Sequence, residues 1–214
     1  MRIAIIDGQI NSDAVTAECT RYQVSNGNVQ ETTKNCNKVS HGTIVSQIIG
    51  LFAKFDEIII LEILYEEEIG NIQNLIAALE WCTQENVNLI NLSIGTTEKE
   101  DFEPLKKICM QLKKQGKLLI AAEHNQGLQA APALFDGVIS VKKMRMKHFM
   151  IYNKRKNQIL ISGEKWLRLK DGSYTKSVNC NSYACACATS VLSRKGKRII
   201  NDRNQKCYKI IWTK

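Results

Sequence analysis

The 214-residue sequence has few of the features that divide a chain into separate parts. It holds only two prolines, its aromatic content is 7%, and no stretch rich in Ser, Gly or Pro separates segments of different composition. Internal repeats are also missing from the sequence. Because hydrophobic residues make up 44% of the chain, it can bury one sizeable core. We therefore expect a single domain that spans residues 1–214.

Long apolar runs of the kind that enter membranes are missing as well. The strongly apolar stretches, such as "EIIILEIL" and "KLLIAA", are far shorter than the roughly 20 residues that a transmembrane helix needs. At the amino terminus, "IAIID" is interrupted by Asp7 too early to form the apolar part of a signal peptide. We expect a soluble, cytoplasmic protein with no membrane partner.

Eight cysteines are present, and without an export signal we expect them to stay reduced, as small and mostly buried side chains. Cys180, Cys185 and Cys187 stand close together in the sequence, as metal ligands often do. However, Cys185 and Cys187 would point to different sides of a helix, and the chain has no CxxC pair. We expect no disulfide, no metal and no cofactor.

Negative charge is in short supply, with 21 Asp and Glu against 30 Lys and Arg and a formal net charge of +9. The basic excess lies mainly after Lys142, in "KKMRMKH", "NKRKNQ" and "SRKGKR". Such a face attracts nucleic acid or an acidic peptide, or it is simply a solvated surface. The aromatic residues that alternate with basic ones in nucleic-acid grooves are missing here, which disfavours nucleic acid as a partner.

Apolar segments with a strand-like pattern alternate with amphipathic helical ones over the first two thirds of the chain. We expect strands at 2–7, 57–64, 88–95, 117–122 and 137–141, and helices at 44–53, 71–87 and 102–116. This alternation favours an α/β fold in which a mostly parallel sheet is flanked by helices on both faces. Ligands bind at the carboxyl ends of such strands. Asp7, Ser93 and Asn125 are expected at that edge.

The pattern changes over residues 142–179, where short alternating segments favour antiparallel strands. The Asp171-Gly172 pair is a strong hairpin signal in this region. A last helix is expected to start near Ser182, and "CYKIIWT" is expected to form an edge strand at the end of the chain.

Three side chains that are far apart in the sequence have the chemistry of an acid-base-nucleophile relay. Asp7 ends the first strand, His41 opens the first helix, and Ser182 stands at the amino end of the last helix. A serine hydroxyl becomes a good nucleophile when an imidazole accepts its proton, and a carboxylate holds that imidazole in the required tautomer. The helix terminus adds N–H donors beside a developing oxyanion.

Five segments that carry these residues resemble the subtilisin-like serine peptidases, or subtilases. They are "IAIIDGQI", "HGTIVSQIIG", "IQNLIAALEWCTQENVNLINLSIG", "LLIAAEHNQG" and "NSYACACATS". They match, in the family's order, the aspartate strand, the histidine helix, the substrate-binding segment, the oxyanion asparagine and the nucleophile motif. The resemblance implies a three-layer subtilisin-like fold, of a small intracellular type without signal peptide or propeptide.

The resemblance also implies a role for individual residues. Asp7 corresponds to the orienting carboxylate, His41 to the general base and Ser182 to the nucleophile. Asn125 and the backbone N–H of Ser182 correspond to the oxyanion hole. The substrate-binding positions are Ser93, Ile94 and Gly95, which would pair with the substrate backbone, and Ala122, Glu123 and His124 beside the pocket for the side chain before the scissile bond.

Two departures from the family pattern affect these expectations. Cys180-Asn181 replaces the usual Gly-Thr before the nucleophile, and the loss of the glycine would crowd the turn that presents Ser182. Glu123 and His124 stand where the family has small residues, so the pocket should be smaller or differently aimed. The Glu123 carboxylate would then favour a substrate with a basic side chain in this pocket, or it would pair with His124 or a nearby lysine.

These observations lead to one main hypothesis and two alternatives. The main hypothesis is a serine endopeptidase that selectively processes an intracellular peptide substrate, such as the leader peptide of a modified ribosomal peptide. The basic region would recruit an acidic leader. The first alternative is a catalytically silent peptide-binding protein, in which Cys180-Asn181 disables Ser182. The second, a nucleic-acid-binding module, depends on charge alone.

Overall fold

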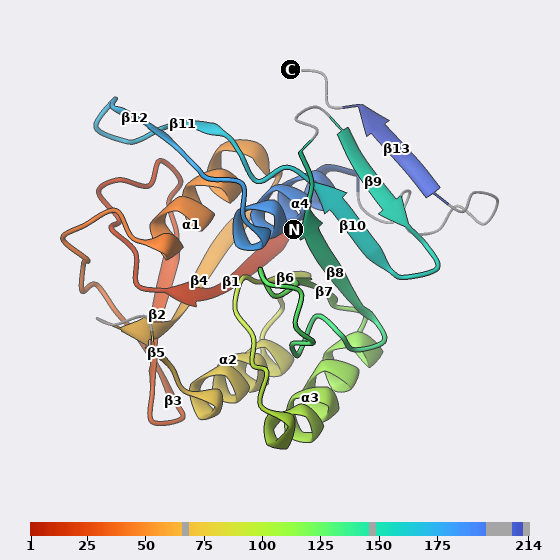
Figure 1. The fold of residues 1–214 in the computed structure, drawn as a ribbon. Coiled ribbons are helices and arrows are strands. Elements are labelled where there is room, and N and C mark those ends of the chain that lie inside the picture. The colour runs from red at the N-terminus through yellow and green to blue at the C-terminus, as the bar shows by residue number, and fades with distance from the viewer. Residues whose placement is uncertain (66–68, 146–148, 196–206, 212–214) are drawn as a thin grey trace.

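The computed structural model describes residues 1–65, 69–145, 149–195 and 207–211, which fold in three layers (Figure 1). Helices α1 (His41–Phe52) and α4 (Asn181–Lys195) pack on one face of a central sheet, and α2 (Ile72–Gln84) and α3 (Phe102–Lys114) pack on the other. The expected α/β architecture with helices on both faces is thereby confirmed. No described helix is long and apolar enough to cross a bilayer.

Within the described residues, eleven strands form the central sheet. Across the sheet they are β13 (Cys207–Ile211), β9 (Phe149–Asn153), β10 (Gln158–Ile161), β8 (Val138–Lys143), β7 (Leu118–Ala122), β6 (Leu89–Leu92), β1 (Arg2–Gly8), β4 (Glu57–Tyr65), β2 (Thr20–Ser25) and β3 (Asn28–Glu31), with β5 (Ile69–Gly70) beside β4. The strands from β10 to β2 pair in parallel, and β13, β9, β5 and β3 add antiparallel pairs.

Strand β1 lies near the middle of this sheet, and its side chains alternate between the two cores. Ile3 and Ile5 are fully buried on the side of α1 and α4, whereas Ala4 and Ile6 are fully buried on the side of α2 and α3. A parallel strand that is covered on both faces reads as a continuous apolar run. This burial explains the "IAII" pattern and sets the residue that follows it, Asp7, at the carboxyl edge of the sheet.

The antiparallel region predicted for 142–179 is present, but it divides into two parts. Strand β10 pairs in parallel with β8 and antiparallel with β9, so this hairpin extends the central sheet. Strands β11 (Trp166–Arg168) and β12 (Tyr174–Lys176) form a separate two-stranded sheet. The hairpin predicted at Asp171-Gly172 joins them, with Gly172 at a φ of +88°.

Candidate active site

Asp7 lies at the carboxyl end of β1, where the chain leaves the sheet. Its side chain is fully buried, and the pairing of β1 with β4 becomes irregular between Asp7 and Gly8. The Oδ1 atom of Asp7 accepts a hydrogen bond of 2.7 Å from the backbone N–H of Gly8. A carboxylate in such a position needs polar partners, because burial removes its hydration.

The partner of Asp7 is His41, the first residue of α1. Ser40 caps this helix in a capping box, in which its Oγ accepts from the N–H of Thr43 at 3.1 Å and Thr43 Oγ1 accepts from the N–H of Ser40 at 3.2 Å. The His41 Nδ1 atom lies 2.8 Å from Asp7 Oδ1. When Nδ1–H donates to this carboxylate oxygen, Nε2 is the acceptor nitrogen of the neutral imidazole.

Gly42 allows the start of α1 to approach the end of β1. A Cβ atom at position 42 would lie only 2.3 Å from the backbone oxygen of Gly8. Any side chain at this position would therefore push the helix away from the strand and lengthen the bond between Asp7 and His41. Close approach, rather than a special φ, explains the glycine in "HGT".

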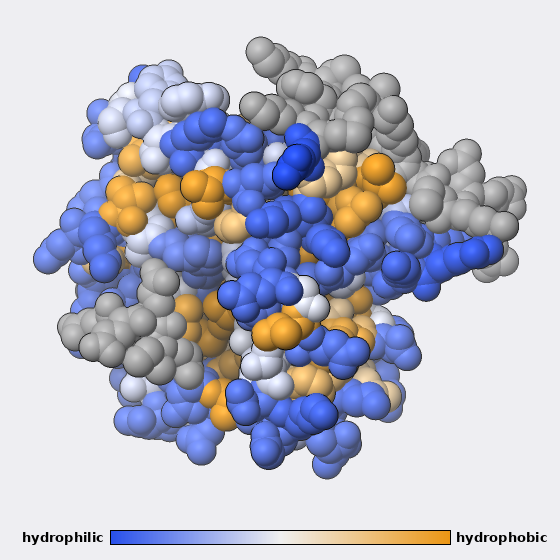
Figure 2. Space-filling view, in the orientation of Figure 1, coloured by the Kyte–Doolittle hydropathy of each residue, from blue (hydrophilic) through white to orange (hydrophobic). Residues whose placement is uncertain are grey.

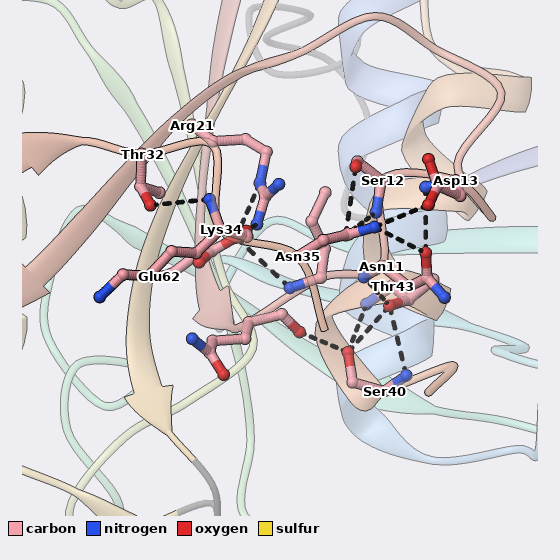
Figure 3. Close-up of polar contacts among 12 residues, drawn as sticks. Asn11, Ser12, Asp13, Arg21, Thr32, Lys34, Asn35, Ser40, Thr43 and Glu62 are labelled. Atoms are coloured by element: carbon pink, nitrogen blue, oxygen red, sulfur yellow. Dashed lines mark hydrogen bonds and ion pairs between the residues drawn. The ribbon is translucent and has the colours of Figure 1, made fainter. Parts of the chain in front are cut away.

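A polar network holds the loops on both sides of this helix start (Figure 3). The Thr43 Oγ1 atom accepts from the N–H of Asn11 at 2.9 Å, and the Asn35 Oδ1 atom accepts from the N–H of Ser12 at 2.7 Å. The Ser40 hydroxyl donates to the carbonyl of Gln9. These bonds connect the segment after β1 to the segment before α1, so they fix the entry of the helix that carries His41.

Ser182 lies in the first turn of α4. The carbonyl of Cys180 accepts the N–H of Ala184 at 3.0 Å, so the N–H of Ser182 belongs to the helix end whose donors lack intrahelical acceptors. The Ser182 hydroxyl is buried and donates to the carbonyl of Ser93 at 3.2 Å. The ring of Tyr183 stacks on His41, with centroids 5.2 Å apart and an interplanar angle of 22°. The start of α4 thus lies against the imidazole.

Asn125 follows β7 and is exposed. Its Oδ1 atom accepts a hydrogen bond of 3.0 Å from the backbone N–H of Asn181, at the start of α4. This bond uses the acceptor of the amide. Among the residues that the structure describes, no acceptor is bonded to its two N–H donors, which suits a group that binds an oxyanion.

The segment expected to pair with a substrate, Ser93–Gly95, follows β6. The Asn91 amide donates to Ser93 Oγ at 2.9 Å and accepts from the Thr189 hydroxyl at 2.8 Å, so this strand end is connected to α4. Beside it lies a groove of about 630 Å³. It is lined by Ile63, Leu64, Asn71, Ile72, Leu75, Ile94, Gly95, Thr96, Glu98 and Asp101. Figure 2 shows a hollow with apolar surface beside α2.

The three positions expected beside the specificity pocket lie at the end of β7. Ala122 is half-buried, and the N–H of Glu123 donates to the carbonyl of Val141 at 2.9 Å. The Glu123 carboxylate accepts from the side-chain amide of Gln158 on β10. His124 accepts from the N–H of Gln126 at 3.3 Å through its Nδ1. The carboxylate of Glu123 is therefore bonded to a neutral amide, whereas the sequence suggested a basic side chain of the substrate, His124 or a nearby lysine as its partner.

Sequence reasoning missed a buried ion pair next to this site. Glu62 on β4 stands opposite Asp7 in the strand register, and its Oε1 accepts from Arg21 at 2.9 Å and 2.7 Å. The same guanidinium donates to the carbonyl of Lys34 (Figure 3). Burial raises the pKa of the Glu62 carboxyl, although the Arg21 guanidinium opposes the shift. The signal was a glutamate in the middle of the apolar run "EIIILEIL".

The residues that the structure describes form no cluster of three or more His, Cys, Asp or Glu that would hold a metal ion. Cys185 and Cys187 are instead fully buried side chains of α4. Burial raises the pKa of both thiols, that of Cys187 to about 12. They belong to the core that α4 shares with the sheet.

Known proteins resemble this chain in sequence and in fold. The minor extracellular protease Epr of Bacillus subtilis (strain 168) is 26% identical over 160 residues, which are 69% of this chain but only 24% of that protein's length. The structure of the prenylagaramide maturation protease PagA matches with a TM-score of 0.66 at 22% identity, over 92% of this chain and 77% of that one.

A second solved structure with the same fold is the epidermin leader peptide processing serine protease EpiP from Staphylococcus aureus. It matches with a TM-score of 0.67 at 15% identity, over 90% of this chain and 64% of that one. The model of the subtilase family, Peptidase_S8, matches residues 2–194, which is most of the chain. This chain therefore belongs to the subtilase family of peptidases.

Proposed function

We propose that this chain is a serine endopeptidase that cleaves peptide bonds through an acyl-enzyme on Ser182. His41 accepts the proton of the Ser182 hydroxyl, and Asp7 holds the imidazole in the required tautomer. The imidazolium then protonates the leaving amine, and the neutral imidazole activates the water that releases the acid. The amide of Asn125 and the backbone N–H of Ser182 stabilise the oxyanion in both steps.

One observation carries this proposal above the others. The Asp7 carboxylate and the His41 Nδ1 are 2.8 Å apart, and the same imidazole stacks on Tyr183, the neighbour of Ser182. Three segments that are far apart in the sequence therefore meet at one sheet edge. The Ser182 hydroxyl donates to Ser93 in this state, so its hydrogen has to turn from that carbonyl to His41 before it can be transferred.

We further propose selective processing of a peptide, such as removal of an acidic leader from a modified ribosomal peptide. Two solved structures with this fold are described as a maturation protease and a leader peptide processing protease. The carboxyl end of β8 adds charge complementarity, because Lys142, Lys143 and Arg145 are exposed there. This strand end lies beside α4, since the N–H of Lys143 donates to the Asn181 side chain at 2.8 Å.

A fluorophosphonate probe tests the chemistry. We expect the native protein to be labelled on Ser182, and we expect Ser182→Ala to lose the label. His41→Ala should retain the nucleophile but lower the rate of amide hydrolysis by about 10⁴-fold or more. Labelling that is absent under native conditions, although a known subtilase is labelled alongside, would instead favour a silent peptide-binding protein.

Cleavage assays test the selectivity. We expect Lys142→Glu and Arg145→Glu to raise KM for an acidic peptide at low salt, with kcat unchanged, because exposed charges act mainly on encounter. Lys107→Glu is the matched control, since it makes the same charge change on α3, on the opposite face of the sheet. Equally fast degradation of unfolded casein and of every peptide tested would refute selectivity.

A further inference from the structure

Asn181 occupies the position immediately before the nucleophile and is only 2% exposed. Its Oδ1 accepts from the N–H of Lys143 at 2.8 Å, and its Nδ2 donates to the carbonyls of Glu123 at 2.8 Å and His124 at 3.2 Å. Its backbone N–H donates to Asn125 Oδ1 at 3.0 Å. One residue of α4 therefore binds the end of β8 and three consecutive residues after β7.

These bonds decide which way the Asn125 amide faces. An amide can turn by half a rotation and exchange its oxygen for its NH₂ group. The turned amide would place NH₂ donors against the Asn181 N–H, which is also a donor, and the bond would be lost. The Asn181 side chain holds the backbone of residues 123–124 so that the amide stays within reach of that N–H. The oxygen of the Asn125 amide therefore faces the Asn181 N–H, and its NH₂ group is the end that can donate to an oxyanion.

We infer that Asn181 is a positioning residue that acts through Asn125, by fixing the donors of the oxyanion hole before substrate binds. The inference depends on the proposed function, because it assigns Asn181 a task in the same reaction. Preorganised donors stabilise the transition state without reorganising during the reaction. The substitution of Cys-Asn for the family's Gly-Thr is thus compatible with catalysis.

The backbone at Cys180-Asn181 and the side chain of Asn181 both support this role of Asn181. Neither Cys180 nor Asn181 is among the residues with positive φ, so the turn has no need of a glycine. The loss of the glycine therefore forces no strained φ on the turn that presents Ser182. A threonine hydroxyl has a single oxygen, and it cannot reach the Lys143 N–H and two carbonyls as the Asn181 amide does.

Asn181→Asp tests the inference, because it keeps the shape and the Oδ1 acceptor but places an oxygen against the carbonyls of Glu123 and His124. We expect kcat for a peptide or ester substrate to fall about 10- to 100-fold, with KM changed less than about threefold. Asn125→Ala alone should lower kcat by about 10²- to 10³-fold. In that background, Asn181→Asp should lower kcat less than about threefold further.

Asn179→Asp is the matched control. The Asn179 Oδ1 accepts from the N–H of Gly163 at 3.1 Å and its Nδ2 donates to the carbonyl of Met144 at 2.9 Å, so the same types of bond are changed without touching Asn125. We expect a similar loss of Tm but a kcat within about threefold of the parent. Full additivity of Asn181→Asp with Asn125→Ala would overturn the inference.

A readout that does not need activity separates this inference from the proposed function. The side-chain amide resonances of Asn125, identified by their loss in Asn125→Ala, should shift in Asn181→Asp and stay in place in Asn179→Asp. If the parent failed to react with fluorophosphonate, the proposed chemistry would be wrong, and these resonances would still decide the positioning. If the Asn125 amide resonances did not move in Asn181→Asp, the inference that Asn181 positions Asn125 would be overturned.

Discussion

Glu62 and Arg21 form a buried ion pair beside the site. Both side chains are nearly inaccessible, with exposed fractions of 1% and 7%. Removal of one partner from a buried ion pair leaves the other charge without its main compensation. We therefore expect Arg21→Met to lower the free energy of unfolding at pH 7 by about 3–5 kcal/mol, measured by urea denaturation.

The same variant should make the stability of the protein more sensitive to pH. Burial raises the pKa of Glu62 above its value in the unfolded chain, so the folded protein binds more protons than the unfolded chain between the two values. Stability consequently falls as pH rises through this window. Without Arg21 the pKa of Glu62 should rise further, and the loss of stability as pH rises above the unfolded-state pKa should be larger than in the parent.

Arg2→Met is the control for the loss of stability expected in Arg21→Met. Arg2 on β1 contacts Glu57 at 2.6 Å, at the start of the same strand β4 that carries Glu62, and both side chains are partly exposed there. Such a pair contributes about 1 kcal/mol or less. Equal losses of stability for Arg2→Met and Arg21→Met would contradict the assignment of Arg21 as a buried counter-charge.

At the scale of elements, the first turn of α4 depends on the loop after β10. A Cβ atom at Gly163 would lie 2.6 Å from the backbone nitrogen of Ala184 and 2.8 Å from the carbonyl oxygen of Cys180. Gly163→Ala should therefore displace the turn that carries Ser182. Because a small displacement of a reacting group lowers the reaction rate strongly, we expect the rate of peptide cleavage to fall at least about 10-fold.

Gly50→Ala makes a matched comparison for this element. Its Cβ would lie 2.8 Å from the Cβ of Ala17, a tight contact near the end of α1 that is distant in sequence from His41. We expect Gly50→Ala to change stability while the rate of cleavage stays close to that of the parent. If both variants lost stability and neither changed the rate, the first turn of α4 would not be the sensitive element.

The elements that sequence patterns predicted are those whose pattern comes from burial on a sheet or helix face. Helices α1, α2 and α3 and the buried strands fall in this class, because a continuous or periodic apolar pattern follows from packing. The hairpin β2–β3 was missed, since its strands at the sheet edge are only partly buried and carry mixed residues. The place of β10 beside β8 depends on pairing between distant segments, which periodicity does not encode.

In the site, the sequence predicted the residues that stand in motifs but not the contacts between distant segments. Asp7, His41, Ser182 and Asn125 stand in motifs that were visible in the sequence, at predicted strand ends or helix starts. The contacts of Asn181 were not visible, because they join α4 to the ends of β7 and β8 in space. Cys180-Asn181 was noted as a departure, but its consequence required the three-dimensional arrangement.

Across the whole molecule, four buried thiols are shared between the cores on the two faces of the sheet. Cys82 and Cys109 lie on the side of α2 and α3, and Cys185 and Cys187 lie on the side of α4. Burial raises the pKa of Cys82 and Cys109 to about 12, as it does for Cys187. The thiolate is the reactive form of cysteine, so these thiols are protected by both inaccessibility and protonation.

We expect iodoacetamide at pH 8 to alkylate these four cysteines only when both cores unfold together, since the two cores share one sheet. Mass spectrometry of peptides along a urea series should give a single midpoint for all four, equal to the midpoint of the circular dichroism transition. Cys36, which is half-buried in the loop before α1, serves as the internal control and should react with the native protein. Earlier labelling of Cys82 and Cys109 would mean that the layer of α2 and α3 opens independently, and that the sheet does not couple the two cores.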